Sequence, residues 1–462
     1  MGEKETIRDE DVVAITKAEG ESSGYIVHSL VEPDGEARAQ GKPPFILSST
    51  HKPSLNEQVL TRHSRPLPAQ LDSGESHIYV LVSVKSGLGQ AELFFETVVE
   101  PVVSAVGLKE TDYSVIWTQN ANTVREFARS ILQPNAERGR KQTVLLLSGD
   151  GGIVDIVNAL LEKGGKSSQY VKPVISQFPL GTGNAVFNST HRIPTDAQEH
   201  VSVPPSIYVQ GLRTLLRGQP RPLPIFKATF SPGARLLSDE GRIATPLQNN
   251  TLYGAVVASY GLHSTLVADS DTTEYRKHGD KRFGLVAKDL LFPEDGSLPH
   301  AYQAQVSLFK SGSTNPVQLP SSEHGYILAS LVSNLERTFT ISPANRPLDR
   351  QLHLVHFPAV SGKQAMEIMT KAYDSGKHVD VEWETEDGVK QKVDYEAIDG
   401  LRIDFNEPGE SWKWRRCCID GLTVAIEEGG WVEIRIVEEG GEVVDVAIDV
   451  TAQTLSKVED EI

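Results

Sequence analysis

The sequence predicts an α/β domain followed by a domain of antiparallel strands. Between residues 77 and 222, apolar strand-like runs alternate with helix-like segments, and the runs are apolar on both faces. That pattern is typical of a parallel sheet covered by helices on both sides. After residue 223 the runs become short, alternate between apolar and polar residues and are separated by turn residues. Short alternating runs favour antiparallel sheets.

The elements of the α/β domain follow one another in a regular order. Each short continuous apolar run predicts a strand, and each longer run with apolar residues three and four apart predicts a helix. We expect strands at 78–84, 113–118, 143–148 and 173–179. We expect helices at 91–106, 123–132, 153–163 and 206–218, before the proline-rich breaker at 219–224.

We expect three regions along the chain. Residues 1–70 mix short strand-like runs with proline-bearing polar stretches and form an accessory region, for which an added edge of the β-rich domain is one interpretation. Residues 71–222 form the α/β domain, and residues 223–455 form the β-rich domain. Within the latter we favour a strand for WKWRR (412–416), although mixed aromatic and basic residues are also typical of membrane or nucleic-acid patches.

Composition and charge exclude several classes of protein. The 462 residues carry a formal net charge of −17, from 62 acidic and 45 basic residues, which opposes attraction to nucleic acid or to anionic membranes. Cys417 and Cys418 are the only cysteines and are adjacent, so they suit a reducing compartment. The chain has no apolar run long enough to span a membrane and no signal-peptide pattern. We therefore expect a cytoplasmic protein with no nucleic-acid partner and no transmembrane segment.

Three glycine turns follow strands of the α/β domain. They are VKSGLG (84–89), SGDGG (148–152) and PLGTGNA (179–185). A glycine turn that leads from a strand into a helix directs backbone N–H groups at one place and forms an anion site. The carboxyl ends of parallel strands line one crevice, so the three turns are expected to meet at one polyphosphate. Neither GxxxxGK[ST] nor GxGxxG is present, which excludes two common nucleotide motifs.

Asp150 stands among the glycines of the second turn. A carboxylate repels phosphate, so its presence makes sense if it holds Mg²⁺ or takes a proton from an attacking hydroxyl. The turns and this aspartate together predict phosphoryl transfer. Asp155 and Asn158 share a face of the following helix, which is expected to be turned toward the crevice. The alternative is a structural role for both residues. The helix dipole stabilises an acid near the start of a helix, and an asparagine can form hydrogen bonds that hold a neighbouring loop.

These motifs resemble the lipid kinases with a diacylglycerol kinase catalytic domain, in particular the sphingosine kinases. The resemblance rests on SGDGGIVDIVNALLE, FPLGTGNAVFNS, GLHSTLVADSDTTEYRKHGDKRFGL and a late aspartate-glycine, Asp420-Gly421, and it runs from about residue 77 to 435. It implies an N-terminal nucleotide-binding domain of the NAD kinase and diacylglycerol kinase type. It also implies a C-terminal lipid-binding domain of the antiparallel β-sandwich type.

The resemblance also implies roles for single residues. Asp150 is the catalytic residue, poised to deprotonate a lipid hydroxyl, and Asp150 and Asp420 hold Mg²⁺. Asp269 and Asp271, with Asp155, bind the polar head of the lipid, where an acid pairs with the amine of a sphingoid base. ATP is contacted by residues of the turns and by later positions: Lys85, Ser86, Gly87, Thr118, Gly149, Gly151, Gly181, Thr182, Gly183, Asn184, Arg276, Arg282 and Asp420.

The expected activity is transfer of the γ-phosphoryl group of Mg-ATP to the primary hydroxyl of a sphingoid base. Because such a substrate lies in a bilayer, we expect transient peripheral contact with intracellular membranes through apolar loops. Two alternatives stay open. One is a diacylglycerol or ceramide kinase. The other is a kinase-like lipid-binding protein with weak or no turnover, because Leu422 follows Asp420-Gly421 where the family has glutamate, and leucine neither binds metal nor accepts a proton.

Overall fold

The chain divides into two compact units. The computed structural model describes residues 7–18, 23–162, 164, 166–192, 204–313, 315–385 and 387–449. Unit 1 comprises Met1–Gly181, His191–Pro222 and Val443–Ile462, and unit 2 comprises Thr182–Thr190 and Leu223–Glu442. Unit 1 contains a mostly parallel sheet with helices and unit 2 contains antiparallel strands, which confirms the expected fold class.

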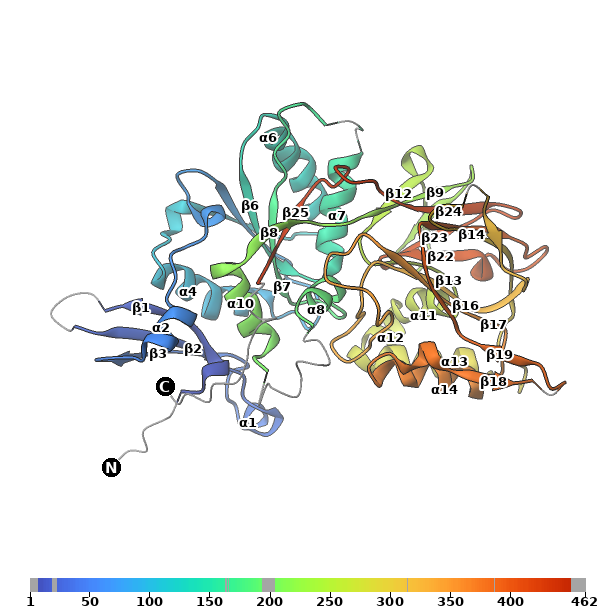
Figure 1. The fold of residues 1–462 in the computed structure, drawn as a ribbon, viewed down its shortest axis with the longest axis horizontal. Coiled ribbons are helices and arrows are strands. Elements are labelled where there is room, and N and C mark those ends of the chain that lie inside the picture. Colours follow the sequence, from blue (N-terminus) through green and yellow to red (C-terminus); the bar gives the residue numbers. More distant parts are fainter. Residues whose placement is uncertain are drawn as a thin grey trace. The chain divides into compact units, whose positions relative to one another are not determined.

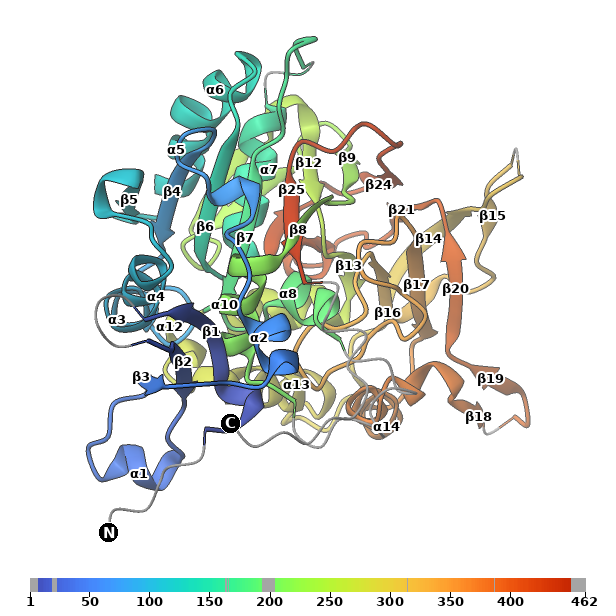
Figure 2. The same cartoon turned by 60° about the vertical axis from the view of Figure 1, so that its left-hand side comes forward.

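A mostly parallel sheet forms the centre of unit 1. Among the described residues it has six strands in the order β5-β4-β6-β7-β25-β8, which can be followed in Figure 2. Only β8 runs antiparallel to its neighbour. The residues of β6 are buried along its whole length, as a strand covered on both faces requires. The strands are β4 (His77–Val82), β5 (Tyr113–Trp117), β6 (Gln142–Ser148), β7 (Val174–Pro179), β8 (Gln219–Pro222) and β25 (Asp445–Ile448).

Helices cover both faces of this sheet. On one face α3 (Ala91–Phe94), η3 (Phe95–Val99), α4 (Glu100–Ala105) and α10 (Ile207–Arg217) share a core with β4, β6 and β7. On the other, Tyr79 of β4 contacts Phe127, and α7 (Asp150–Leu161) packs on α5 (Thr123–Phe127) and η5 (Ala128–Leu132), which leads into α6 (Gln133–Glu137). The π-helical turns η3 and η5 lie just before Pro101 and Pro134. Proline lacks an N–H and crowds the carbonyl four residues back, which widens the preceding turn.

One strand of the expected β-rich domain belongs to unit 1. The run EVVDVAIDV was assigned to residues 223–455, but its strand β25 pairs in parallel with β7 and antiparallel with β8. An ion pair between Lys172 and Asp445 (2.6 Å) fixes the start of the strand. That expectation is therefore corrected. The run alternates like any half-buried strand, and local alternation does not reveal which sheet a strand joins.

The N-terminal region forms a small sheet of its own. Strands β1 (Val12–Lys17), β2 (Tyr25–Val31) and β3 (Ile46–Lys52) are antiparallel neighbours, and α2 (Glu57–His63) packs on β1 (Figure 1). The sheet belongs to unit 1, so its interpretation as an edge of the β-rich domain is wrong. The region also contains η1 (Asp9–Asp11), α1 (Gly35–Ala39) and η2 (Ala69–Leu71), and η4 (Glu110–Asp112) precedes β5.

Antiparallel strands build unit 2. Within the described residues they join one fourteen-stranded arrangement with the main order β11-β10-β23-β22-β13-β16-β14-β21-β24-β9-β12. Strand β14 curls this sheet because its first residues pair with β16 and the rest pair with β21. The strands are β9 (Phe226–Phe230), β10 (Arg235–Ser238), β11 (Ile243–Pro246), β12 (Thr251–Gly254), β13 (Val257–Gly261), β14 (Tyr302–Phe309), β15 (Val317–Gln318), β16 (Glu323–Ser330), β17 (Leu352–Pro358), β20 (Asp394–Ile398), β21 (Gly400–Phe405), β22 (Arg416–Ile419), β23 (Leu422–Ala425) and β24 (Trp431–Ile436).

Helices pack on part of the unit 2 sheet. Helix α11 (Leu262–Ser270) lies on β13, β16 and β22, and α13 (Arg282–Leu291) packs on α11 and on α14 (Gly362–Thr370). WKWRR begins as the 3₁₀ turn η10 (Trp412–Arg415), so the expected strand starts only at Arg416. No helix in the described parts of the chain has the length and apolarity needed to cross a bilayer. The remaining elements are α8 (Ala185–Thr190), η6 (Gln248–Asn250), α12 (Thr273–Arg276), η7 (Gly279–Lys281), η8 (Lys371–Tyr373), η9 (Lys377–Asp380), β18 (Glu382–Glu384) and β19 (Lys390–Lys392).

A buried charged cluster attaches the N-terminal sheet to α10. Arg213 of α10 is buried and donates to the carbonyl oxygens of Val12 (2.9 Å) and Asp9 (2.6 Å). The Asp9 carboxylate accepts from Nε2 of His63 (2.9 Å) and pairs with Arg62 (2.9 Å). Nδ1 of His63 is buried and has no partner among the described residues. Burial, together with the charges of nearby arginines, lowers the pKa of His63 to about 4.

The protein should therefore lose stability as the pH falls from 6.5 toward 4. Unfolded His63 binds a proton near pH 6.5, whereas the folded protein resists protonation until about pH 4, so the contribution is complete above pH 6.5 and lost on acidification. The part of this loss that is due to His63 should reach about 3 kcal/mol. Denaturant titrations at pH 7.5 and pH 4.5 measure it. His63→Gln should show a smaller drop, and an equal drop in both proteins would contradict the assignment.

Candidate active site

The first glycine turn packs against the start of the third. Gly87 has a positive φ of 53°, and a Cβ built there would lie 2.5 Å from the carbonyl oxygen of Leu180. Only glycine accepts that conformation together with so close an approach. Its next neighbour is Gly181, 3.0 Å from the same position. The turn after β4 and the turn after β7 therefore lie in direct contact.

The second turn joins the first through a hydrogen bond. Gly149 precedes α7, and its N–H donates to Oγ of Ser86 at 3.2 Å. A Cβ at Gly152 would lie 3.0 Å from Oγ of Ser148, so this glycine permits close packing of α7 on β6. At Gly151 no described atom lies within 4 Å of a Cβ. A ligand can thus approach the backbone at the start of α7, where N–H groups and the helix dipole favour anions.

The third turn continues from unit 1 into unit 2. Gly181 belongs to unit 1, whereas Thr182, Gly183 and Asn184 belong to unit 2. Asn184 has a positive φ of 55°, and the side chain of Asn188 donates to the carbonyl oxygen of Gly183 (2.7 Å). The structure therefore brings together Ser86, Gly87, Gly149 and Gly181 within unit 1. Their contacts with ATP stay predictions.

Asp150 is the first residue of α7 and is partly buried. Its place at the helix start, directly after Gly149, puts a carboxylate beside the N–H groups of the two joined turns. On the first turn Lys85 is exposed. Thr118 accepts the N–H of Val84 through Oγ1 (3.1 Å) and so fixes the beginning of that turn. The role of Asp150 as a base stays a prediction.

Asp155 points toward a neighbouring helix. Its carboxylate lies 3.4 Å from the guanidinium group of Arg125 on α5. Burial raises the pKa of Asp155 to about 6, and Arg125 opposes that rise. The side chain of Asn158 donates to the carbonyl oxygen of Val154 in its own helix (2.9 Å). These contacts support the structural alternative for both residues, and lipid binding by Asp155 stays a prediction.

In unit 2, the residues expected at the phosphates and at the lipid head pair with one another. Asp271 accepts two hydrogen bonds from Arg276 (3.0 and 2.7 Å), and Arg282 lies 3.9 Å away. Asp269 instead pairs with Lys413 of η10 (3.0 Å) and with Arg416 at the start of β22 (2.8 Å). An anion that bound Arg276 would therefore compete with Asp271.

Asp420 holds the backbone of unit 2. Its carboxylate accepts from the N–H groups of Ala255 (2.5 Å), Val256 (3.0 and 3.2 Å) and Val257 (2.7 Å). A carboxylate offers about four acceptor positions, and these bonds occupy them. This arrangement favours a structural role over the predicted metal role. Leu422, two residues later, is partly buried and packs against the hydrophobic core of unit 2.

A magnesium ion would depend mainly on Asp150. Among the described residues no group of three or more His, Cys, Asp or Glu side chains is arranged to hold a metal ion. Mg²⁺ in nucleotide sites commonly keeps several waters and binds one or two carboxylates together with the phosphates. One carboxylate beside phosphate-binding turns meets that requirement. The residues present therefore fit a magnesium ion carried in with ATP.

An acidic pit and an apolar cavity adjoin each other in unit 2. The pit has a volume of about 380 Å³ and is lined by Lys413 and by four acids, Glu240, Asp269, Glu274 and Asp289. The cavity has a volume of about 20 Å³ and is lined mostly by apolar side chains of α11, α13, β17 and α14: Leu262, Leu290, Leu291, Phe357 and Ala365. Leu290 of α13 lines both. A polar and an apolar region thus share Leu290 of α13 in their linings.

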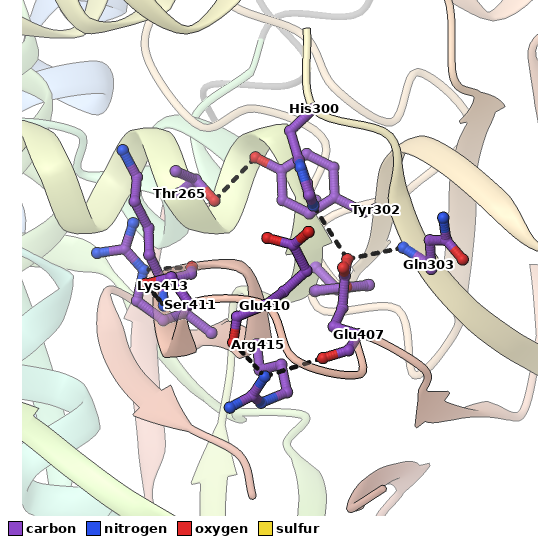
Figure 3. A network of polar contacts seen from close by, with 12 residues as sticks. Thr265, His300, Tyr302, Gln303, Glu407, Glu410, Ser411, Lys413 and Arg415 are labelled. Carbon is purple, nitrogen blue, oxygen red and sulfur yellow. Dashed lines mark hydrogen bonds and ion pairs between the residues drawn. The ribbon is translucent and has the colours of Figure 1, made fainter. Parts of the chain in front are cut away.

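A polar network closes one wall of the apolar cavity. His300 lines the cavity, stacks on Trp414 (4.0 Å between ring centroids) and contacts the buried carboxylate of Glu407 (3.1 Å). Glu407 also accepts from Tyr260 (3.1 Å) and from the N–H of Gln303 (2.8 Å), as Figure 3 shows for Gln303 and His300. Sequence reasoning missed these residues and Leu290. The available signals were the segment WKWRR (412–416), which contains Trp414, and the amphipathic segment 281–292, which predicts a helix.

Comparison with known proteins gives a match for the first domain. Residues 77–227 match the family model of the diacylglycerol kinase catalytic domain. This stretch of the chain is similar to that catalytic domain. The match includes the first two glycine turns, Asp150 and the third turn, so the residues that the structure brings together in unit 1 all lie inside the matched range.

Relatives of the chain include two sphingosine kinases. Sphingosine kinase 1 of Homo sapiens is 31% identical over 109 residues, which are 24% of this chain and 26% of that protein. In that match the chain spans only about a quarter of the relative. Sphingosine kinase 1 of Mus musculus is 22% identical over 330 residues, which are 66% of this chain and 78% of that protein. A solved diacylglycerol kinase of Bacillus anthracis str. Sterne is 14% identical, with a TM-score of 0.47 over 81% of this chain and 98% of that chain.

Two adjacent glycines of the second glycine turn should respond differently to substitution by alanine. Gly151→Ala places a methyl group in open space, so the protein should unfold at the same temperature as the parent but bind Mg-ATP about tenfold or more weakly. Gly152→Ala forces a methyl group against Ser148 and Leu146 and should lower the unfolding temperature. Calorimetry measures both quantities. Unchanged ATP affinity in Gly151→Ala would contradict phosphate binding at this turn.

Proposed function

We propose that the protein is an ATP-dependent lipid kinase that phosphorylates the primary hydroxyl of a sphingoid base. The observation that carries the proposal is the position of Asp150 at the start of α7, beside two glycine turns joined by the Ser86–Gly149 hydrogen bond. This arrangement supplies an anion site and a base in one place. The family match of residues 77–227 supports a lipid kinase.

The proposed reaction uses positioning and charge rather than covalent catalysis. Backbone N–H groups of the glycine turns hold the phosphates, and Asp150 accepts the proton of the lipid hydroxyl as its oxygen attacks the γ-phosphorus. The bond from that phosphorus to the β–γ bridging oxygen breaks, and ADP leaves. Arg276 and Arg282 are proposed to stabilise the charge on the transferring group. Mg²⁺, when bound, would neutralise charge on the outer phosphates.

The acidic pit beside the apolar cavity supports a lipid with a cationic head. Two of the pit's four carboxylates are already paired, Asp269 with Lys413 and Arg416, and Glu240 with Arg242. Glu274 and Asp289 have no ion pair among the described residues, and these two acids favour an amine over a neutral headgroup. The apolar cavity, which shares Leu290 with the pit, suits a hydrocarbon chain. At about 20 Å³ it admits little more than a water molecule, so α13 or α14 must move to admit the chain. The names of the two mammalian relatives agree with a sphingoid substrate.

The lipid must be taken from a membrane. Leu285 and Phe292, in and just after α13, are exposed at 38% and 48%, beside the proposed lipid site. We propose a cytoplasmic protein that makes transient peripheral contact with intracellular membranes through this apolar segment.

A second candidate is a kinase-like lipid-binding protein without turnover. Leu422 packs against the core where the family has glutamate, and the Asp420 carboxylate is occupied by backbone N–H groups. Leu422 offers no metal ligand, and the bonds to backbone N–H groups weigh against the predicted metal role of Asp420. A diacylglycerol or ceramide kinase is a further alternative within the same class, and the choice of lipid in the next experiment separates it.

Asp150→Asn should abolish transfer without abolishing nucleotide binding. The amide keeps the shape of the side chain but accepts no proton, so kcat should fall by about 10²- to 10⁴-fold while Mg-ATP affinity changes little. Transfer of labelled phosphate is measured with sphingoid bases, ceramide, diacylglycerol and NAD. Glu57→Gln, which removes an acid from the first turn of α2, is the matched control and should be fully active.

Each outcome separates the candidates. Transfer to sphingoid bases that Asp150→Asn abolishes supports the proposal, whereas preference for diacylglycerol or ceramide supports the alternative kinases. Binding of ATP and lipid without transfer by the parent protein supports the second candidate. If Asp150→Asn leaves turnover unchanged, the assigned base is wrong.

A further inference from the structure

We propose that Asn334 is a positioning residue for the third glycine turn, and through it for the phosphates of ATP. The inference rests on the proposed function. Asn334 lies in the loop that connects β16 to β17, far in sequence from the turn it would support, and belongs to unit 2 together with Thr182–Thr190. All contacts in the argument therefore lie within one unit.

The third turn needs external support. It leads into α8, which has only six residues, and an isolated helix of that length is not stable in water. Within the turn, Asn184 adopts a positive φ of 55°, which costs energy for a residue other than glycine. The bond from Asn188 to the carbonyl oxygen of Gly183 ties the turn to α8 (2.7 Å). Whatever holds α8 therefore also holds Gly183 and Asn184.

Two hydrogen bonds between the backbone of Asn334 and the side chain of Ser189 form a clamp that holds α8. The N–H of Asn334 donates to Oγ of Ser189 (3.0 Å), and that hydroxyl lies 3.3 Å from the carbonyl oxygen of Asn334, to which it donates. Both residues are buried, so neither bond is exchanged easily for water. The carbonyl oxygen of Leu335 also lies 3.0 Å from where a Cβ of Gly183 would be. The loop thus contacts the turn itself as well as α8.

The side chain of Asn334 holds the backbone that makes this clamp. Its Oδ1 accepts from the hydroxyl of Ser333 (2.8 Å), and its Nδ2 donates to Oγ1 of Thr340 (3.1 Å). Asn334 and Thr340 also form a β-bridge, and the N–H of Thr340 donates to the carbonyl oxygen of Ala372 in η8 (3.0 Å). The clamp is therefore anchored in unit 2 through a short hairpin, and no atom of Asn334 needs to touch ATP.

The β16–β17 loop offers a matched control. Asn345 is a second buried asparagine in the same loop, and its Nδ2 donates to the carbonyl oxygen of Gln351 (2.8 Å). Removing either side chain deletes a buried amide hydrogen bond, so both variants should lose similar stability. Of these two asparagines, Asn334 is the one for which a hydrogen bond to α8 is found among the described residues. A difference between the variants in ATP affinity therefore reports positioning rather than general loss of stability.

The test compares Asn334→Ala, Ser189→Ala, their double mutant and Asn345→Ala in the full chain. Asn334→Ala and Ser189→Ala should each raise the KM for ATP and the Kd of a non-hydrolysable ATP analogue by about 3- to 10-fold, with kcat changed less than KM. The double mutant should be little worse than either single variant, because Ser189→Ala removes the hydroxyl of the clamp and Asn334→Ala releases the backbone that binds that same hydroxyl. Asn345→Ala should bind ATP like the parent.

The results separate this inference from the proposed function. If the parent protein binds the analogue but Asn334→Ala and Asn345→Ala bind it equally well, the positioning role is overturned. Independent, multiplying effects of Asn334→Ala and Ser189→Ala would also overturn it. If Asn334→Ala does not fold, the comparison of the analogue's Kd between Ser189→Ala and Asn345→Ala decides whether the positioning role holds. A parent protein that binds no ATP analogue overturns the proposed function itself.

Discussion

The close approach of the glycine turns after β4, β6 and β7 is the constraint on which the candidate site depends. A Cβ at Gly87 would lie only 2.5 Å from the carbonyl oxygen of Leu180, so no residue with a side chain fits there. The hydroxyl of Ser86 accepts a hydrogen bond from the N–H of Gly149. These contacts exist because β4, β6 and β7 are successive parallel neighbours in the sheet, so their carboxyl ends lie at one edge. Parallel pairing is thus what places Asp150 next to the joined glycine turns, which we propose as an anion site.

Unit 2 makes two separate contributions. It supports the second half of the third turn, since α8 and the β16–β17 loop are both part of it. It also contains an acidic pit and an apolar cavity that share Leu290 in their linings. The chain is covalently continuous from Gly181 to Thr182, so the nucleotide turn belongs partly to the unit with the candidate lipid site. A movement of α13 or α14 that admitted a lipid chain would therefore occur within the unit that holds Gly183 and Asn184.

Local sequence pattern was sufficient for those parts of the molecule whose structure is decided by near neighbours. Apolar runs predict the strands, and glycines at strand ends predict turns such as 84–89 and 148–152. Long-range partners were not predictable. The alternating run of β25 does not reveal that it joins the parallel sheet, and nothing near Asp420 indicates that its carboxylate binds the N–H groups of residues 255–257. The neighbours of Leu290 and Asn334 are likewise set by tertiary packing alone.

Amide hydrogen exchange with and without a non-hydrolysable Mg-ATP analogue tests the central claim most directly. The claim is that the three turns bind one triphosphate through backbone N–H groups. It predicts slower exchange on nucleotide binding at residues 84–89, 148–152 and 181–184 together, because bound phosphate engages these N–H groups and excludes water. Protection of a single turn, or protection confined to other segments while the nucleotide is bound, would contradict it.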